Sequence, residues 1–322
     1  MGKRKIKKSV KRLFYISIIL ILFLTISIYS GIKIYKQKEY EKTYEYKLLQ
    51  IGYSNEDVKI ITSKYKNKEI DYILTNDNNN IYIDILKDKY FIYDNFYDYL
   101  EYYQNNLDKP NRNIVEIINT NTDKEYYTDI LKTDASKEDL LLVNKYYSLE
   151  SDYEPDNLVT ISTTYSWGEY GSKKATEETY NAYLDMWNAA KENGYYLMVS
   201  SSYRNYDKQE SVYNEYKEKG GTEYADSYAA RPGHSEHETG LALDIFEKNN
   251  TRQETFHESD VYLWLKDNAH NYGFILRYPL DKENITGYSF ESWHYRYVGK
   301  DIATYIYNNG ITYDEYYAYF IA

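Results

Sequence analysis

An uncharged apolar segment near the N-terminus constrains the fold of this 322-residue chain more than any other feature. Residues 13–32 carry no charged side chain, whereas residues 1–12 carry seven Lys or Arg and no acid. Twenty helical residues rise roughly 30 Å, the hydrocarbon thickness of a bilayer. Because basic residues mark the cytoplasmic end of such helices, we expect a cytoplasmic tail over 1–12 and a transmembrane signal-anchor over 13–32. The rest would then lie outside the cytoplasm, in a single-pass protein of the cell membrane.

A cleaved signal peptide is the alternative interpretation of this segment. Its apolar region would be shorter, and a small-x-small cleavage site would follow it. The end of the segment, Tyr29-Ser-Gly-Ile-Lys33, matches such a site poorly. We therefore favour an anchor that is not cleaved.

The chain is acidic, and its basic tail conceals how acidic the main part is. The net charge of −11 includes the seven cations of residues 1–12, so the remaining residues carry −18. Such a surface would not attract nucleic acid, and wall polyanions would repel it. The chain contains no Cys, which excludes a disulfide framework. A domain of this size can be stable without disulfides because it buries enough apolar surface.

Tyrosine is unusually frequent, at 45 residues of 322. One explanation is a set of aromatic platforms that bind glycan or peptide. The other is coding bias, since Ile, Lys and Asn are abundant as well. We favour coding bias, because an apolar ring with a polar hydroxyl suits both core and surface.

A spacer or small, mainly helical module is predicted between the membrane and the main domain, over residues 33–139. Ser54 is expected to begin a helix, because Ser with an acid three residues later resembles a capping box. The other predicted elements are a charged helix over 33–50, short helices over 67–109 that end at Asp108-Lys-Pro110, and a strand over 113–119. No catalytic constellation is apparent in this part of the sequence.

Residues 140–322 are predicted to form a domain of the α+β class. Strand and helix patterns are interleaved there, which indicates a small mixed or antiparallel sheet with flanking helices. The predicted helices cover 176–193 and 260–272, and the predicted strands cover 195–200, 241–246, 274–277 and 293–298. Gly194 and Gly273 follow the two helices, where a C-terminal cap belongs.

Two short stretches, 231–244 and 291–294, gather the residues that suit metal chemistry. If Gly240 turns the chain into the following strand, His237 lies on the incoming loop and Asp244 on the strand. Both side chains can then converge on one point. An unpaired carboxylate on a buried strand is costly, so Asp244 needs a cation or an arginine as its partner.

His294 offers a third ligand for such a cation. Two His and one Asp leave the fourth tetrahedral position of a zinc ion to water, as in catalytic rather than structural sites. Glu291 precedes His294 by three residues and can take a proton from that water. We therefore predict one zinc ion per chain held by His237, Asp244 and His294, although other divalent ions would fit. The other histidines, expected to have loop or structural roles, are His234, His257 and His270.

The two stretches resemble the signatures of the VanY-type D-alanyl-D-alanine carboxypeptidases, zinc peptidases of bacterial cell-wall metabolism. The pattern Ser-x-His-x-x-Gly-x-Ala-x-Asp is matched by Ser235, His237, Gly240, Ala242 and Asp244. The pattern Glu-x-Trp-His is matched by Glu291, Trp293 and His294. A third pattern, Tyr-Arg-x-x-x-x-Gln, is matched by Tyr203, Arg204 and Gln209. The resemblance covers about residues 140–322.

The resemblance implies a metallo-carboxypeptidase in which Glu291 is the catalytic base. It also implies that Arg204, Gln209 and Ser235 hold the terminal carboxylate of the substrate. A guanidinium group binds carboxylate with two hydrogen bonds, which suits an enzyme that must recognise a free C-terminus. Glu238 departs from the family, which often has Gln there. Its negative charge beside a ligand is expected to shift the metal affinity or the pH optimum.

The reaction implied is zinc-dependent removal of the C-terminal D-alanine from peptidoglycan stem peptides, by a monomer anchored in the membrane. An L,D-carboxypeptidase or an endopeptidase acting on the same stem peptides is the alternative within this class. A non-catalytic wall-binding protein is the alternative from another class. Such a protein would be expected to have lost a ligand or Glu291, and the sequence retains all of them.

Overall fold

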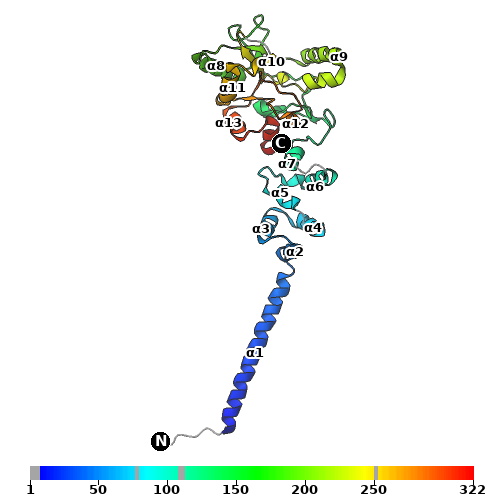
Figure 1. Cartoon of the computed structure of the whole chain (residues 1–322), viewed down its shortest axis with the longest axis vertical. Coiled ribbons are helices and arrows are strands. Elements are labelled where there is room, and N and C mark those ends of the chain that lie inside the picture. The colour runs from blue at the N-terminus through cyan, green and yellow to red at the C-terminus, as the bar shows by residue number, and fades with distance from the viewer. Residues whose placement is uncertain (1–7, 77–79, 108–112, 250–252) are drawn as a thin grey trace. The chain divides into compact units, whose positions relative to one another are not determined.

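The computed structural model describes residues 8–76, 80–107, 113–249 and 253–322. The chain divides into two compact units, Met1–Tyr93 and Asp94–Ala322, which are described in turn (Figure 1). The first unit begins with the long helix α1 (Lys8–Tyr40), drawn in blue in Figure 1. Among the described residues, Val10–Tyr40 is the one helix long and apolar enough to cross a membrane. The predicted apolar segment is therefore helical, and it is a candidate membrane span or signal sequence. Residues 1–7 of the predicted tail lie outside the described residues.

Short helices make up the rest of the first unit, and the prediction of one continuous helix over 33–50 is wrong. The helix is interrupted before Thr43, whose side chain accepts a hydrogen bond from the Tyr46 N–H and caps a new helix. Ser54 caps the next helix as predicted, by accepting from the Asp57 N–H. The helices are α2 (Tyr44–Gln50), α3 (Asn55–Lys64), α4 (Asn67–Thr75) and α5 (Ile81–Lys87).

The second unit begins with two helices, α6 (Phe96–Asn105) and α7 (Ile114–Asn119). The strand predicted over 113–119 is therefore wrong. Four apolar residues in two pairs, interrupted by Glu116, fit a buried helix as well as a strand. Here the side chain of Asn113 accepts from the Glu116 N–H and caps a helix. The predicted helix stop at Asp108-Lys-Pro110 lies outside the described residues.

A four-stranded antiparallel sheet forms the centre of the second unit. Its strands lie in the order β5-β6-β8-β7, with bounds close to those predicted. They are β5 (Leu197–Ser201), β6 (Ala242–Glu247), β7 (Phe274–Leu276) and β8 (His294–Tyr297). Two smaller pairs join β1 (Leu131–Lys132) to β2 (Tyr147–Ser148) and β3 (Leu158–Thr160) to β4 (Lys174–Thr176).

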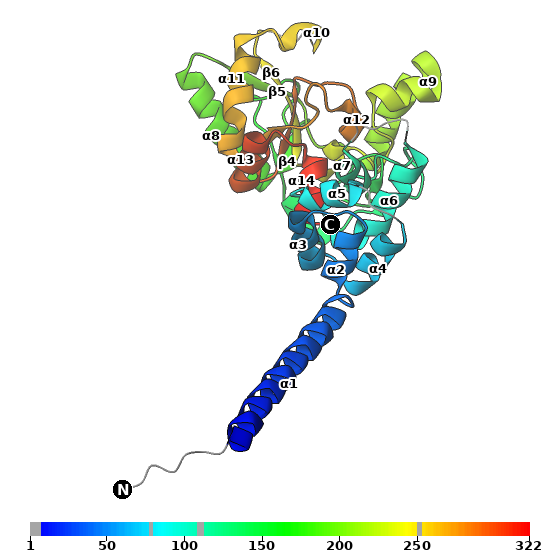
Figure 2. The ribbon, with the colours of Figure 1, turned by 60° about the horizontal axis from the view of Figure 1, so that its bottom comes forward.

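Helices cover one face of this sheet. The main core packs α8 (Glu177–Glu192) and α11 (Asp260–Asn268) against buried strand residues such as Leu243 and Tyr295. Figures 1 and 2 both draw these two helices next to each other, whereas α9 (Tyr206–Tyr228) lies on the other side of the unit. The helical prediction over 260–272 holds as α11 followed by the 3-10 turn η4 (Ala269–Tyr272). The remaining elements are the 3-10 turns η1 (Tyr93–Asn95), η2 (Ala135–Leu140) and η3 (Glu236–Thr239) and the helices α10 (Gln253–Phe256), α12 (Glu283–Thr286), α13 (Lys300–Asn309) and α14 (Tyr313–Phe320).

The alternation of β6 separates the core from the site. Leu243 and Ile245 belong to the core, so Ala242 and Asp244 point to the opposite face. Gly240 turns the chain from η3 into β6, as predicted, with a left-handed φ of 71°. A Cβ at this glycine would lie 3.0 Å from the Leu158 side chain.

Replacing Gly240 with Ala should destabilise the second unit more than the control substitution Gly194→Ala. Both glycines have positive φ, so each alanine costs about 1–2 kcal/mol for its left-handed backbone. Only at Gly240 does the added Cβ also meet side chains, because nothing lies within 4 Å of one at Gly194. Chemical unfolding of the full chain in mild detergent measures both losses. Equal losses would contradict tight packing around Gly240.

Candidate metal centre

The three predicted metal ligands lie together in the structure. Their ligand atoms, from His237, Asp244 and His294, are all within 4.8 Å of one another. The Asp244 Oδ1 atom lies 3.4 Å from His237 Nε2 and 3.3 Å from His294 Nδ1. Such an arrangement of two imidazoles and a carboxylate around one point suits a tetrahedral zinc ion with an open position.

Backbone structure brings these ligands together. Asp244 on β6 and His294 on β8 are direct cross-strand partners, so their side chains share one face of the sheet. His237 lies in η3, whose position is fixed by a hydrogen bond from the Arg204 N–H to the His237 carbonyl. The His237 Nδ1 atom lies 2.9 Å from the Ser202 carbonyl, to which it donates, so the lone pair of Nε2 faces Asp244.

The carboxylate of Asp244 fits a bound cation. Its Oδ1 atom is buried and accepts no hydrogen bond from the residues that the structure describes. A buried carboxylate oxygen without such a partner is costly unless a cation neutralises it. Burial acts to raise the pKa of Asp244, but the charged imidazole of His294 outweighs it and holds this pKa below its usual range, so the carboxylate stays ionised.

The two imidazoles differ in protonation. Burial, with Arg204 nearby, lowers the pKa of His237 to about 4, which leaves it neutral and able to bind a metal. Burial also acts to lower the pKa of His294, but the carboxylates of Asp244 and Glu236 outweigh it and raise this pKa to about 9. A cation that binds His294 Nδ1 therefore displaces a proton.

Glu291 lies beside the ligands, with its Oε2 atom 3.4 Å from His294 Nδ1. Burial raises the pKa of Glu291 to about 7, repulsion from Asp244 adds to the rise, and attraction to His294 opposes it. A carboxylate with a pKa near neutrality can both accept and return a proton at the same pH.

A cleft of about 490 Å³ opens above this cluster. All seven predicted site residues line it: Arg204, Gln209, Ser235, His237, Asp244, Glu291 and His294. One wall comes from α9, including Tyr216 and Tyr228, and the other includes His257 and Phe290. His257, for which a structural role is expected, has a half-exposed side chain that lies in the cleft wall.

Arg204 is held in place by side chains on both sides. Its Nε donates to Gln209 Oε1 at 2.9 Å, and its Nη1 donates to Ser201 Oγ at 3.0 Å. Gln209 in turn donates from Nε2 to the Ala230 carbonyl at 2.8 Å. Nη2 of Arg204 makes no hydrogen bond within the described part of the chain, and it belongs to a side chain that lines the cleft.

Two histidines lie apart from the ligand cluster. His234 is buried, and its Nδ1 atom lies 2.7 Å from the Asn144 carbonyl. His270 stacks on Tyr307 with ring centroids 3.8 Å apart.

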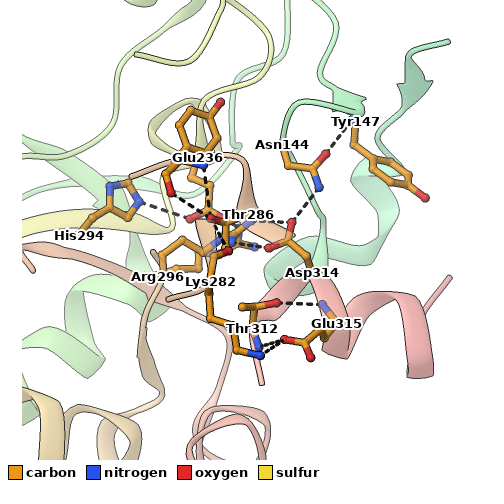
Figure 3. Close-up of polar contacts among 12 residues, drawn as sticks. Asn144, Tyr147, Glu236, Lys282, Thr286, His294, Arg296, Thr312, Asp314 and Glu315 are labelled. Atoms are coloured by element: carbon orange, nitrogen blue, oxygen red, sulfur yellow. Dashed lines mark hydrogen bonds and ion pairs between the residues drawn. The ribbon is translucent and has the colours of Figure 1, made fainter. Parts of the chain in front are cut away.

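Sequence reasoning missed the buried groups behind His294. The His294 Nε2 atom lies 3.4 Å from Glu236 Oε2 (Figure 3). Glu236 also contacts Arg277 and Arg296. Glu236 stands next to a predicted ligand, which is the one local signal for it. The two arginines carry no local signal, since they are far from Glu236 in the sequence.

Comparison with known proteins agrees with this geometry. A family model described as VanY, D-alanyl-D-alanine carboxypeptidase, matches residues 172–300. The chain is 41% identical over 204 residues to a putative carboxypeptidase, YodJ, of Bacillus subtilis (strain 168), a match that covers 61% of this chain and 75% of that protein. The chain belongs to the VanY family.

Two further relatives illustrate the range of this family. A D-alanyl-D-alanine carboxypeptidase of Enterococcus faecalis (strain ATCC 700802 / V583) is 43% identical over 143 residues, which cover 41% of this chain and 51% of that protein. The solved structure of the LdcB LD-carboxypeptidase has a TM-score of 0.56 and 39% identity, and the match covers 61% of this chain and 92% of that one. As a VanY-family member, the protein is a metallo-carboxypeptidase and hence a hydrolase.

Glu238, the residue next to the ligand His237, closes a turn beside the ligands. Its two carboxylate oxygens accept from the Gly233 N–H at 2.9 and 3.1 Å, and one accepts from the Ser235 N–H at 3.4 Å. Burial raises the pKa of Glu238 to about 7, although these backbone donors oppose the rise. The carboxylate thus serves as a local cap for η3.

Replacing Glu238 with Gln should stabilise the protein more at pH 8 than at pH 5. In the folded chain the pKa of Glu238 is about 7, above the usual value of 4.5, so charging it when folded costs stability. This cost is absent below pH 4.5, grows as the pH rises towards 7 and is complete above that pH. We expect the increase in Tm caused by Glu238→Gln to be a few °C larger at pH 8 than at pH 5. A shift of this size corresponds to about 1 kcal/mol of stability.

The measurement is thermal unfolding of the full chain in detergent with chelator present, so that metal binding does not contribute. Glu218→Gln, at an exposed position of α9, is the control and should show no such trend. A gain that is the same at both pH values would contradict the raised pKa.

Proposed function

We propose that this protein is a zinc-dependent D-alanyl-D-alanine carboxypeptidase that removes the C-terminal D-alanine from peptidoglycan stem peptides. The observation that carries the proposal is one cleft that holds His237, Asp244 and His294 with Glu291 beside them and Arg204 in its wall. Metal ligands, a base and a carboxylate-binding cation are the groups that hydrolysis next to a free C-terminus requires.

Each residue has a defined part in this proposal. Zinc bound to His237, Asp244 and His294 would polarise the scissile carbonyl and acidify the attacking water. Glu291 accepts a proton from that water as the C–O bond forms, and returns a proton to the amine nitrogen as the C–N bond breaks. Arg204 pairs with the terminal carboxylate and fixes the peptide, and positioning of this kind can supply several kcal/mol of barrier reduction. Ser235 lines the same cleft and contributes a polar contact to the substrate.

Gln209 contributes to substrate binding through Arg204. Its amide joins the Arg204 guanidinium to the Ala230 carbonyl, and its side chain is buried. It therefore limits the directions in which Arg204 can point.

The domain organisation and location are proposed as the sequence indicates. Residues 140–322 form the catalytic domain, residues 33–139 form a spacer, and residues 13–32 within α1 anchor a monomer in the cell membrane with the catalytic domain outside. The long apolar helix supports the anchor. The acidic composition of the rest of the chain argues against nucleic acid as a partner.

An L,D-carboxypeptidase acting on tetrapeptide stems is the second candidate function. It is favoured by the similarity to the LdcB LD-carboxypeptidase structure, which has a TM-score of 0.56. Both candidates use the same cleft and differ in which stem peptide they shorten.

Incubation with defined stem peptides distinguishes these candidates. The full chain in mild detergent is mixed with a pentapeptide ending in D-Ala-D-Ala or with a tetrapeptide ending in one D-Ala, and products are measured by mass spectrometry. We expect loss of one D-alanine from the pentapeptide, inhibition by chelator and recovery with zinc. Loss of D-alanine from the tetrapeptide alone would establish the second candidate. Zinc content near one per chain with neither product would show a binding protein.

Replacing Glu291 with Ala should leave zinc bound and lower kcat by about 10²–10⁴-fold, the usual contribution of a general base. Replacing His237 with Ala should instead lose the metal. Zinc content by elemental analysis and turnover of the pentapeptide measure both variants. Glu218→Gln, at an exposed position of α9 that does not line the cleft, is the control and should retain both. Normal turnover by Glu291→Ala would remove Glu291 from the mechanism.

Replacing Arg204 with Ala should abolish the preference for a free C-terminus. The unmodified protein should prefer the pentapeptide acid over its C-terminal amide, because only the acid pairs with the guanidinium. The loss of one such pair costs on the order of 2–4 kcal/mol, or about 30–1,000-fold in kcat/KM for the acid. The amide should be affected little. An unchanged ratio of acid to amide in the variant would assign carboxylate recognition to another group.

A further inference from the structure

A buried network of charged side chains lies directly behind His294. Glu236 Oε1 accepts from Arg277 Nε at 2.7 Å and from Arg296 Nη1 at 2.9 Å, while Glu236 Oε2 lies 3.4 Å from His294 Nε2. Glu236, Arg277 and Arg296 are at most 1% exposed. Figure 3 shows Glu236 between His294 and Arg296.

The network continues to the C-terminal helix α14. Arg277 donates from Nη1 to Asp314 Oδ2 at 2.6 Å and from Nη2 to Asp314 Oδ1 at 3.2 Å. Asn144 donates to Asp314 Oδ1 at 2.8 Å. Arg296 is held from the other side, because its Nη2 donates to the Leu141 carbonyl at 2.8 Å. Two arginines and two carboxylates thus balance in charge, with partners on every side.

Stability alone does not account for such a network. Buried ion pairs often contribute little net stability, because desolvation offsets their attraction. They do, however, fix the orientation of the side chains that they join. The two arginine donors take Oε1 of Glu236, which leaves Oε2 as the acceptor for the Nε2–H of His294. His294 then presents Nδ1, without rotation of its ring, to Asp244.

We propose that Glu236 is a positioning residue for metal binding, and that Arg277 and Asp314 hold it in place. The carboxylate keeps the proton of His294 on Nε2 and so leaves Nδ1 for the metal. In His237 a backbone carbonyl accepts the proton of the nitrogen that does not face the metal site, whereas in His294 a side-chain carboxylate does so. Asp314 and Asn144 lie outside the matched residues 172–300, so segments on both sides of the family match support the metal centre. This inference rests on the ligand assignment of the proposed function.

Replacing Glu236 with Gln should weaken zinc binding by about 10–100-fold. The two arginines require the amide oxygen, so the amide nitrogen would face His294 Nε2 and donate to it. That contact favours the His294 tautomer with its proton on Nδ1, which competes with the metal. Zinc affinity of the full chain in detergent is measured by competition with a chromophoric chelator. In zinc-loaded protein, NMR should show a slowly exchanging His294 Nε2 proton that this variant lacks.

A second pair of variants decides the matter if Glu236→Gln fails to fold. Asp314→Asn weakens the hold on Arg277 and should lower zinc affinity by about tenfold, the lower end of the same range. Glu315→Gln is the matched control. Glu315 is a buried acid in the same helix that accepts from the Thr312 N–H and pairs with Lys282 at 3.2 Å, and its hydrogen bonds do not involve Arg277.

The outcomes separate the possible explanations. A loss of zinc affinity with Asp314→Asn but not with Glu315→Gln, at similar losses in Tm, supports a positioning network. The inference would be overturned if Asp314→Asn and Glu315→Gln both bound zinc as tightly as the unmodified chain. It would also be overturned if both variants lost the same amount of zinc affinity. If His237→Ala also retained zinc, the ligand assignment of the proposed function would be wrong instead.

Discussion

The pairing of β6 with β8 is the contact on which the site depends. Asp244 lies opposite His294 in this register, and Leu243 lies opposite Tyr295. Since alternate residues point to opposite faces, the register that buries Leu243 and Tyr295 also brings the carboxylate and the imidazole together. A slip by one residue would turn Asp244 into the core and the apolar side chains towards the cleft. The packing of the core therefore keeps the metal ligands in place.

Much of this arrangement could be predicted from local sequence, because the patterns that determine it are local. Alternation in 241–246 identifies both the strand and the face that carries Asp244, and Gly240 identifies the turn before it. The prediction of a strand over 113–119 is wrong because its four apolar residues satisfy a helix and a strand equally, and a hydrogen bond from one backbone N–H to Asn113 decides between them. The support of His294 could not be predicted at all. Arg277 and Asp314 are far from Glu236 in the chain, and only the folded structure brings their charges together.

On the substrate side of the cleft, as at the metal ligands, a functional side chain is oriented by buried neighbours. Arg204 is oriented by Gln209, which is oriented by the Ala230 carbonyl, as His294 is oriented by Glu236 and its arginines. In both cases a group that would contact metal or peptide is held by buried neighbours that would contact neither. Preorganisation of this kind lowers the entropy that must be lost when a ligand binds.

The connections between the strands have a different role from the strands themselves. The connection from β5 to β6 contains α9 and provides residues of one cleft wall, such as Tyr228. The connection from β6 to β8 contains α10 and provides residues of the other wall, such as His257. Surface connections tolerate exchange and insertion far better than paired strands do. Selection can therefore remodel the walls to prefer one stem peptide over another while the bond-breaking groups stay unchanged on the sheet. One metal centre could in this way give rise to enzymes of differing specificity without any new chemistry.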